Sequence, residues 1–100
     1  MAATAQTFQT IHPEAGTQGT RVDAAKYEAM KAAMLAVVPA AADGSPFQDL
    51  VDAVRPRLPA ELFANASVSW YVTTIKLDLE ARGLIERVPG ARPQHVRRAA

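Results

Sequence analysis

The sequence predicts a mainly α-helical domain of three helices that ends in a small β-hairpin. Residues 70–82 repeat their apolar positions with the period of a helix, Gly83 interrupts this pattern, and residues 84–88 alternate with the two-residue period of a strand. Pro89-Gly90 then supplies a turn, and residues 94–98 supply a return arm rich in arginine. A helix that leads directly into a basic hairpin is therefore the central feature of the expected fold.

The third helix has one clear end and two candidate beginnings. Glycine adopts the left-handed conformation that often follows a helix, and Arg82 places a cation at the negative end of the helix dipole. At the other end, the hydroxyl group of either Ser67 or Ser69 is a suitable N-cap. We therefore expect a helix over residues 68–82.

Steps of 100° per residue divide this helix into two apolar arcs and one narrow polar strip. One arc contains Tyr71 and Ile75, and the other contains Trp70 and Leu77. Large aromatic residues at helical spacing usually fill a core, so we expect Trp70 and Tyr71 to be buried rather than to stack on a ligand. The polar strip consists of Ser69, Thr73, Lys76 and Glu80.

The terminal hairpin presents several arginines. Residues 88–91 fit a type II turn, because proline presets the second position and glycine allows a positive φ at the third. Leu84, Val88 and Val96 are then expected to face inward. The side chains expected to project outward are Arg87, Arg92, Arg97 and Arg98. They either meet a phosphate backbone or form a solvated face, which is the usual role of a short charged run.

Charge is divided unevenly along the chain. Residues 1–81 hold six Lys/Arg and nine Asp/Glu, a net charge of −3, whereas residues 82–100 hold five Arg and one Glu, a net charge of +4. Arginine forms bidentate contacts with phosphate and with guanine edges. This local basic stripe favours a nucleic-acid partner, although the whole chain carries a net charge of only +1.

Length and composition indicate the class of protein. One hundred residues, of which 49% are hydrophobic, suffice for one domain with its own core. The chain contains no cysteine, which excludes disulfides and thiolate metal sites. The sequence lacks the features of a signal peptide and any apolar run as long as a membrane span. We expect a soluble cytoplasmic protein without a membrane partner, a cofactor or a metal site.

Two further helices are predicted before the third. Asp23 is a suitable N-cap for a helix over residues 23–38, where apolar residues recur at three- and four-residue steps. Ser45-Pro46-Phe47-Gln48 fits a capping box and begins a second helix over residues 46–55. Residues 56–66, with two prolines, are expected to form a longer connection that contains one short helical turn.

Residues 1–21 have a different composition from the rest of the chain. They are rich in Thr, Gln, Ala and Gly, and Phe8 and Ile11 are their only large apolar residues. Such a segment buries little surface by itself. We expect a flexible tail or, as the alternative, an extended arm laid on the same domain or on a second copy. The folded domain then covers residues 22–100.

Three helices followed by a terminal hairpin resemble the winged helix-turn-helix superfamily. The resemblance covers residues 22–98 and is most specific at Trp70-Tyr71 and in the run from Ile75 through Gly83 to Arg87. The chain is also similar to small, uncharacterised bacterial winged-helix proteins. The resemblance implies a DNA-binding protein of the transcription-regulator type, with the third helix in the major groove and the wing on the adjacent backbone. The residues that it places on double-stranded DNA are Ser67, Ser69, Thr73, Lys76, Arg87, Arg92 and Arg97.

The winged-helix fold also allows a second function. Some winged-helix domains dock proteins or dimerise without binding DNA, because a fold alone does not determine function. The link between the second and third helices is about ten residues long, whereas a compact helix-turn-helix uses three or four. Lys76 is the only cation expected on the exposed strip, and no Asn, Gln or Arg for base reading accompanies it. A protein partner or a homodimer is the alternative to DNA.

Catalysis is not expected. Asp78 and Glu80 lie 200° apart around a helix, so they do not form an acid–base pair. They instead match Arg82 and Lys76 as ion pairs four residues apart. No phosphate loop or nucleophile-elbow motif is present in the sequence.

Overall fold

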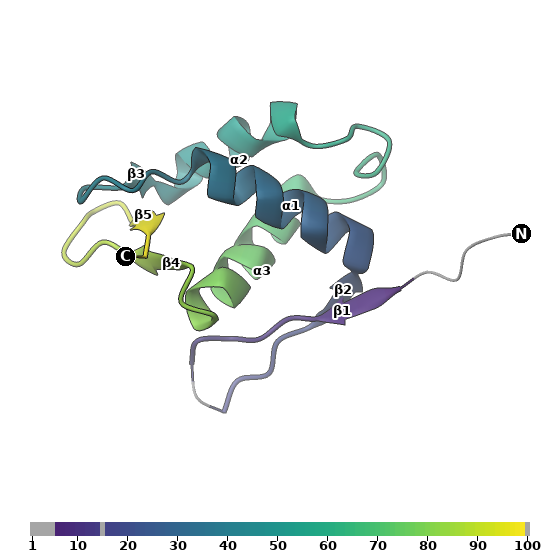
Figure 1. Cartoon of the computed structure of the whole chain (residues 1–100), viewed down its shortest axis with the longest axis horizontal. Coiled ribbons are helices and arrows are strands. Elements are labelled where there is room, and N and C mark those ends of the chain that lie inside the picture. Colours follow the sequence, from purple (N-terminus) through teal and green to yellow (C-terminus); the bar gives the residue numbers. More distant parts are fainter. Residues whose placement is uncertain (1–5, 15, 100) are drawn as a thin grey trace, which may run out of the picture.

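Three α-helices and two small antiparallel sheets make up the fold of the described residues (Figure 1). The structure, a computed structural model, describes residues 6–14 and 16–99. The helices are α1 (Ala24–Val37), α2 (Phe47–Val54) and α3 (Val68–Ala81), and a short 3-10 helix, η1 (Arg55–Arg57), follows α2. The strands are β1 (Thr7–Gln9), β2 (Arg21–Asp23), β3 (Ser45–Pro46), β4 (Ile85–Arg87) and β5 (His95–Arg98). The three predicted helices and the terminal hairpin are confirmed.

The two sheets lie near opposite ends of α1 (Figure 1). One is the hairpin of β1 and β2, which leads directly into α1. In the other sheet β5 is central, and it pairs with β3 on one side and with β4 on the other, both antiparallel. Because β3 comes from the segment between α1 and α2, this sheet joins the middle of the chain to its C-terminal hairpin.

Serine and aspartate side chains cap the first turns of α1 and α3. Asp23 accepts a hydrogen bond from the backbone N–H of Lys26 at 3.0 Å, as predicted. Ser67 accepts one from the backbone N–H of Trp70 at 3.1 Å. Ser67, and not Ser69, is therefore the N-cap of α3.

Gly83 ends α3 in the way that the sequence predicted. Its φ angle is +76°, in the left-handed region. The N–H of Gly83 donates to the carbonyl of Glu80, and the N–H of Leu84 donates to the carbonyl of Leu79. These two bonds make a Schellman motif, which satisfies carbonyl groups that the helix end leaves free.

The start of α2 differs from the predicted capping box. Ser45 and Pro46 lie in β3, where they pair with β5, and no side chain caps the first turn of α2. Instead, the backbone N–H of Phe47 donates to the carbonyl of Gln94 at 2.8 Å. The prediction of Ser45 as an N-cap is wrong because the local pattern does not reveal a strand partner far along the chain.

The C-terminal hairpin turns at Pro89-Gly90. Gly90 has a φ angle of +76°, and the N–H of Ala91 donates to the carbonyl of Val88 at 3.4 Å, as a type II turn requires. Val96 faces inward and is fully buried. Leu84, which was also expected to face inward, is exposed because it lies in the turn that follows α3, ahead of β4.

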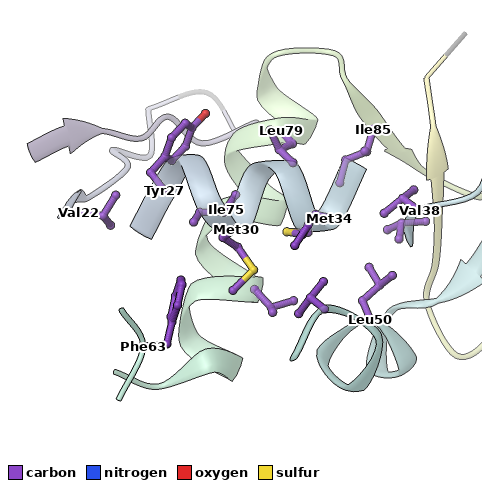
Figure 2. Close-up of a cluster of buried hydrophobic side chains, with 14 residues drawn as sticks. Val22, Tyr27, Met30, Met34, Val38, Leu50, Phe63, Ile75, Leu79 and Ile85 are labelled. Carbon is purple, nitrogen blue, oxygen red and sulfur yellow. The ribbon is translucent and has the colours of Figure 1, made fainter. Parts of the chain in front are cut away.

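The core lies between the three helices and reaches the C-terminal sheet (Figure 2). Its fully buried apolar residues are Tyr27, Met30, Met34, Val38, Leu50, Val54, Val72, Ile75, Leu79, Ile85 and Val96. Each large side chain that is removed from water contributes about 1.5–3 kcal/mol. The side of α3 that carries Ile75 and Leu79 is therefore the side that anchors this helix to α1.

The N-terminal segment folds back on the domain as a hairpin, on the side of α1 opposite α2 (Figure 1). The ring of Phe8 stacks on the ring of Tyr27, with centroids 4.0 Å apart. Of the two alternatives for residues 1–21, the described part corresponds to an arm laid on the same chain. Residues 1–5 and 15, which the same expectation included, lie outside the described residues.

Candidate functional site

The outer face of α3 points away from the core, and it consists of Ser69, Trp70, Thr73 and Leu77. Ser69 and Thr73 are exposed, and Leu77 is half-buried. Trp70 is 46% exposed, so the expectation that it anchors the core is wrong. Apart from α3 itself, the hollow beside Trp70 is lined by residues 10–12 and 18–20 of the N-terminal hairpin, and no other helix of the described residues contributes to it.

Two adjoining hollows lie between α3 and the loop of the N-terminal hairpin. The larger has a volume of about 500 Å³ and extends to β4, and the smaller has a volume of about 250 Å³ and extends to Trp70. His12 and Leu77 line both hollows. The two hollows therefore form one groove, which we call the α3 groove.

The two ends of the α3 groove differ in chemistry. At one end lie Ile11 and Trp70, two of the large apolar side chains that remain exposed in the described residues. The charged groups at the other end are Glu14, Glu80, Glu86 and Arg87. An apolar end and a mostly acidic end on one groove provide separate binding positions for a ligand with two kinds of side chain.

Glu80 is a buried carboxylate at the acidic end. Its side chain is 8% exposed, and its Oε2 lies 3.3 Å from Lys76 Nζ and 3.4 Å from Arg87 Nε. Its Oε1 is buried and has no hydrogen-bond partner within the described part of the chain. A buried acceptor without a partner costs about 1–3 kcal/mol. A donor that reached this oxygen would offset that cost.

Lys76 is buried, although the sequence predicted an exposed position for it. Its exposed fraction is 3%, and Nζ lies near Glu80 and 5.0 Å from the centroid of the Phe47 ring. Burial lowers the pKa of the ammonium group, and the nearby carboxylate opposes this shift. The expected exposure is wrong because Phe47, at the start of α2, lies over a position that the helical pattern alone leaves open.

Asp78 is a second buried carboxylate, and it joins three segments of the chain. It accepts hydrogen bonds from the hydroxyl of Tyr27, from Arg82 Nε at 2.8 Å and from the backbone N–H of Ile11 at 2.9 Å. Burial and the carboxylate of Asp78 raise the pKa of Tyr27, and the same carboxylate raises the pKa of Arg82. The bond to Ile11 holds the hairpin loop beside α3 and so positions one wall of the α3 groove.

Helical spacing predicted part of this cluster. The ion pairs of Asp78 with Arg82 and of Glu80 with Lys76 are both present. The spacing did not predict that both carboxylates are buried, nor that Tyr27 and Ile11 donate to Asp78. Those donors come from α1 and the N-terminal hairpin, and no sequence signal near Asp78 indicates them.

The wing arginines that were expected on DNA differ in their exposure to solvent and in their contacts. The Arg87 side chain is 58% exposed at the acidic end of the α3 groove, and Arg92 is exposed in the loop between β4 and β5. Arg97 is held in place, since its Nε lies 2.6 Å from Glu86 Oε2 and its Nη1 donates to the carbonyl of Ala42 at 2.7 Å. Two of the three arginines are thus open to solvent.

The helical residues that were expected on DNA also divide into groups. Ser69 and Thr73 lie beside Trp70 on the outer face of α3. Ser67 is exposed, but its hydroxyl oxygen already accepts the capping hydrogen bond. Lys76 is buried, so the outer face itself carries no cation.

Residues 6–14 and 16–99 contain neither a candidate metal-binding cluster nor a candidate membrane-spanning helix. No group of three or more His, Asp or Glu side chains in these residues is arranged to hold a metal ion. None of the helices described in this range combines the length and the apolar character that crossing a bilayer requires.

One family match spans the N-terminal hairpin, all three helices and most of the C-terminal sheet. The "Family of unknown function (DUF6958)" matches residues 7–96. The chain belongs to the DUF6958 family. Because the match runs from β1 into β5, both walls of the α3 groove lie within the DUF6958 region. No curated protein and no solved structure matches the chain.

Proposed function

We propose that this DUF6958 protein is a winged-helix module that binds a protein partner through the outer face of α3. The order helix, strand, helix, helix, hairpin supports the winged-helix assignment. So does the C-terminal sheet, in which β3 pairs with the return strand of the hairpin. The loop between β4 and β5 is then the wing.

The exposure of Trp70 is the observation that carries the proposed function. Tryptophan is enriched among the residues that dominate binding energy at protein interfaces. Trp70 lies next to Ile11 in the α3 groove, and its neighbours on the helix, Ser69 and Thr73, are uncharged. A DNA-binding face needs cations to neutralise phosphates, and Lys76 is buried. The outer face of α3 is therefore better suited to a protein than to DNA.

A peptide selection tests this proposal. Random peptides displayed on phage are selected against the folded protein, and the affinity of synthetic copies is measured by calorimetry. Because Trp70 is the only tryptophan, its fluorescence reports binding at this face directly. We expect Trp70→Ala to weaken binding by about 30-fold or more. The matched control is Asp52→Ala, on the exposed side of α2, which should leave the affinity unchanged.

Two results would overturn the proposed function. One is a selection that yields no peptide above background. The other is a set of peptides that bind without any change in Trp70 fluorescence and bind the Trp70→Ala variant equally well.

Double-stranded DNA is the second candidate partner, and the exposed wing arginines favour it. Arg87 and Arg92 are open to solvent, and the segment from residue 82 onward has a net charge of +4. A fluorescence-anisotropy titration with duplex DNA at two salt concentrations tests this function. Replacing Arg87, Arg92 and Arg97 with Ala should weaken binding on all sequences and reduce its salt dependence, by about 0.9 counterions for each lost contact. Absence of wild-type binding tighter than about millimolar at low salt would reject DNA.

A further inference from the structure

We infer that the α3 groove binds an extended peptide with a large apolar side chain at Trp70 and a lysine or arginine at Glu80. This inference rests on the proposed protein-binding function and adds the chemistry of the partner. It follows from three properties of the groove: its length, its apolar end and the unpaired acceptors at its acidic end.

The length of the α3 groove sets the spacing of the two side chains. Trp70 and Glu80 lie on one helix, about ten residues apart, which corresponds to a separation of about 15 Å. An extended peptide advances about 3.3 Å per residue. The apolar residue and the basic residue of the partner should therefore stand four or five positions apart.

The apolar end has room for a large side chain. The hollow of about 250 Å³ lies between Trp70 and the hairpin loop, and Ile11, Thr74 and Leu77 are among the residues that line it. Ile11 is 41% exposed, and it has no packing partner that covers it fully. An aromatic or long aliphatic side chain in this hollow would remove both Ile11 and Trp70 from water, which is the main source of affinity at such positions.

At the acidic end, two carboxylates keep oxygens that no cation of the described residues pairs with. Glu86 is matched by Arg97 at 2.6 Å, and the Oε2 of Glu80 is matched by both Lys76 and Arg87. The Oε1 of Glu80 has no partner, and Glu14 makes no ion pair among the residues that the structure describes. These two groups remain available to a cation that enters the groove.

Arg87 is the side chain that must move for this cation to reach Glu80. Its contact with Glu80 is long, at 3.4 Å, and its side chain is mostly exposed. Because the Arg87 end of this pair is solvated, solvent screening weakens the pair. Rotation of Arg87 into solvent exchanges its cation for the cation of the peptide, so that Glu80 keeps a charged partner.

The selected peptides themselves give the first test. Peptides of about twelve residues span the groove in extended form. We expect enrichment of Lys or Arg four or five positions from an aromatic or long aliphatic residue. Exchange of that cation for methionine should weaken binding about tenfold or more, the effect of losing a hydrogen bond to a charged group. A shift of the cation by two positions should weaken binding as well.

Variants of the protein identify the contact. Glu80→Gln and Glu14→Gln should each lower the affinity for the basic peptide but not for its methionine version. The control is Glu61→Gln, which changes an exposed carboxylate in the link before α3. Thermal melting of each variant confirms that it folds. Because Glu14 is exposed, its substitution keeps the test valid even if Glu80→Gln disturbs the pairing with Lys76.

The results separate this inference from the proposed function. Peptides that need Trp70 but show no basic preference, and that bind Glu14→Gln and Glu80→Gln at full strength, would overturn the inference and leave the protein-binding function intact. Failure of every peptide to use Trp70 would overturn both. Light scattering that shows dimers closed through Trp70 would identify a second copy as the occupant and would also overturn the basic-peptide inference.

Discussion

At the scale of single residues, Asp78 shows how one side chain positions a distant segment. It lies in the middle of the buried network that joins α1, α3 and the loop after β1. A buried carboxylate is stable only when several donors surround it. The position of the loop beside α3, and with it the shape of the α3 groove, therefore depends on Asp78 and its partners.

Removal of one donor should destabilise the protein measurably. In Tyr27→Phe the ring that stacks on Phe8 remains, but Asp78 loses a hydrogen bond in a fully buried position. A hydrogen bond to a charged group contributes about 1.5–3 kcal/mol. We expect the free energy of unfolding, measured with urea, to fall by that amount. An unchanged midpoint would show that Asp78 is satisfied without this hydroxyl.

The same tyrosine predicts a loss of stability at alkaline pH. Burial and Asp78 raise the pKa of Tyr27 above its ordinary value of 10.0. In the unfolded chain Tyr27 ionises near pH 10, whereas in the folded protein it keeps its proton to higher pH. Above pH 10 the unfolded state therefore binds fewer protons than the folded state. The stability that the raised pKa of Tyr27 provides is present below pH 10 and is lost as the pH rises toward the pKa of the folded protein.

The measurement is a series of urea titrations between about pH 8 and pH 11. We expect the wild-type midpoint to decline above pH 10, with a smaller decline in Tyr27→Phe. Equal declines in the two proteins would assign the effect to other groups.

Trp70 should contribute less to stability than a core tryptophan does. Truncation of a buried tryptophan to alanine costs about 3–5 kcal/mol. Since Trp70 is 46% exposed, we expect Trp70→Ala to cost roughly half as much, about 2 kcal/mol, and to leave a folded protein. Thermal unfolding followed by circular dichroism checks this value. A loss of about 4 kcal/mol or more would mean that Trp70 is buried in solution, for instance by a second copy.

At the scale of secondary structure, the end of α3 depends on one glycine. An alanine at position 83 would meet no atom within 4 Å, but it would have to keep a φ angle of +76°. Left-handed backbone costs a residue with a side chain about 1–2 kcal/mol. We expect Gly83→Ala to lower stability by that amount and Gly83→Asn to lower it less, because asparagine tolerates this conformation.

A urea titration of both Gly83 variants measures the cost. Ser69→Ala, in the exposed first turn of α3, serves as the control and should change stability by no more than about 0.5 kcal/mol. Equal stability of Gly83→Ala and the wild type would show that α3 continues beyond Arg82 in solution.

At the scale of the whole molecule, the N-terminal hairpin is part of the folded unit. Phe8 covers Tyr27 and lies 5.0 Å below the guanidinium group of Arg82, and the loop supplies the Ile11 donor to Asp78. The family match likewise begins at residue 7, within β1. The hairpin therefore both stabilises α1 and α3 and forms one wall of the groove.

Deletion of residues 1–20 should lower the melting temperature. The deletion removes the cover of Tyr27 and one donor to Asp78, for a combined cost of roughly 2–3 kcal/mol. In a domain of this size such a cost corresponds to a decrease of about 10 °C or more. Differential scanning calorimetry measures the decrease. An unchanged melting temperature would mean that the segment behaves as a tail and that the groove has no fixed wall on that side.

The sequence by itself determined the order of the helices and the terminal hairpin, together with the limits of α1 and α3. Asp23, Gly83 and Pro89-Gly90 act through their own backbone geometry or through amides a few residues away, so these signals hold in any surroundings. The same local rule predicted the ion pair of Asp78 with Arg82.

Only the tertiary structure decided which side chains are open. At Lys76 and at Trp70, the helical pattern gives the direction of the side chain around the helix axis. It does not give the neighbouring segment that covers or exposes that side chain. Phe47 lies over Lys76, whereas Trp70 stays 46% exposed. The α3 groove was not predictable for the same reason: its second wall comes from residues 10–14 and 18–20, and the hydrogen bond from the backbone N–H of Ile11 to Asp78 holds this segment beside α3. Burial is a property of pairs of distant segments, whereas periodicity is a property of one segment.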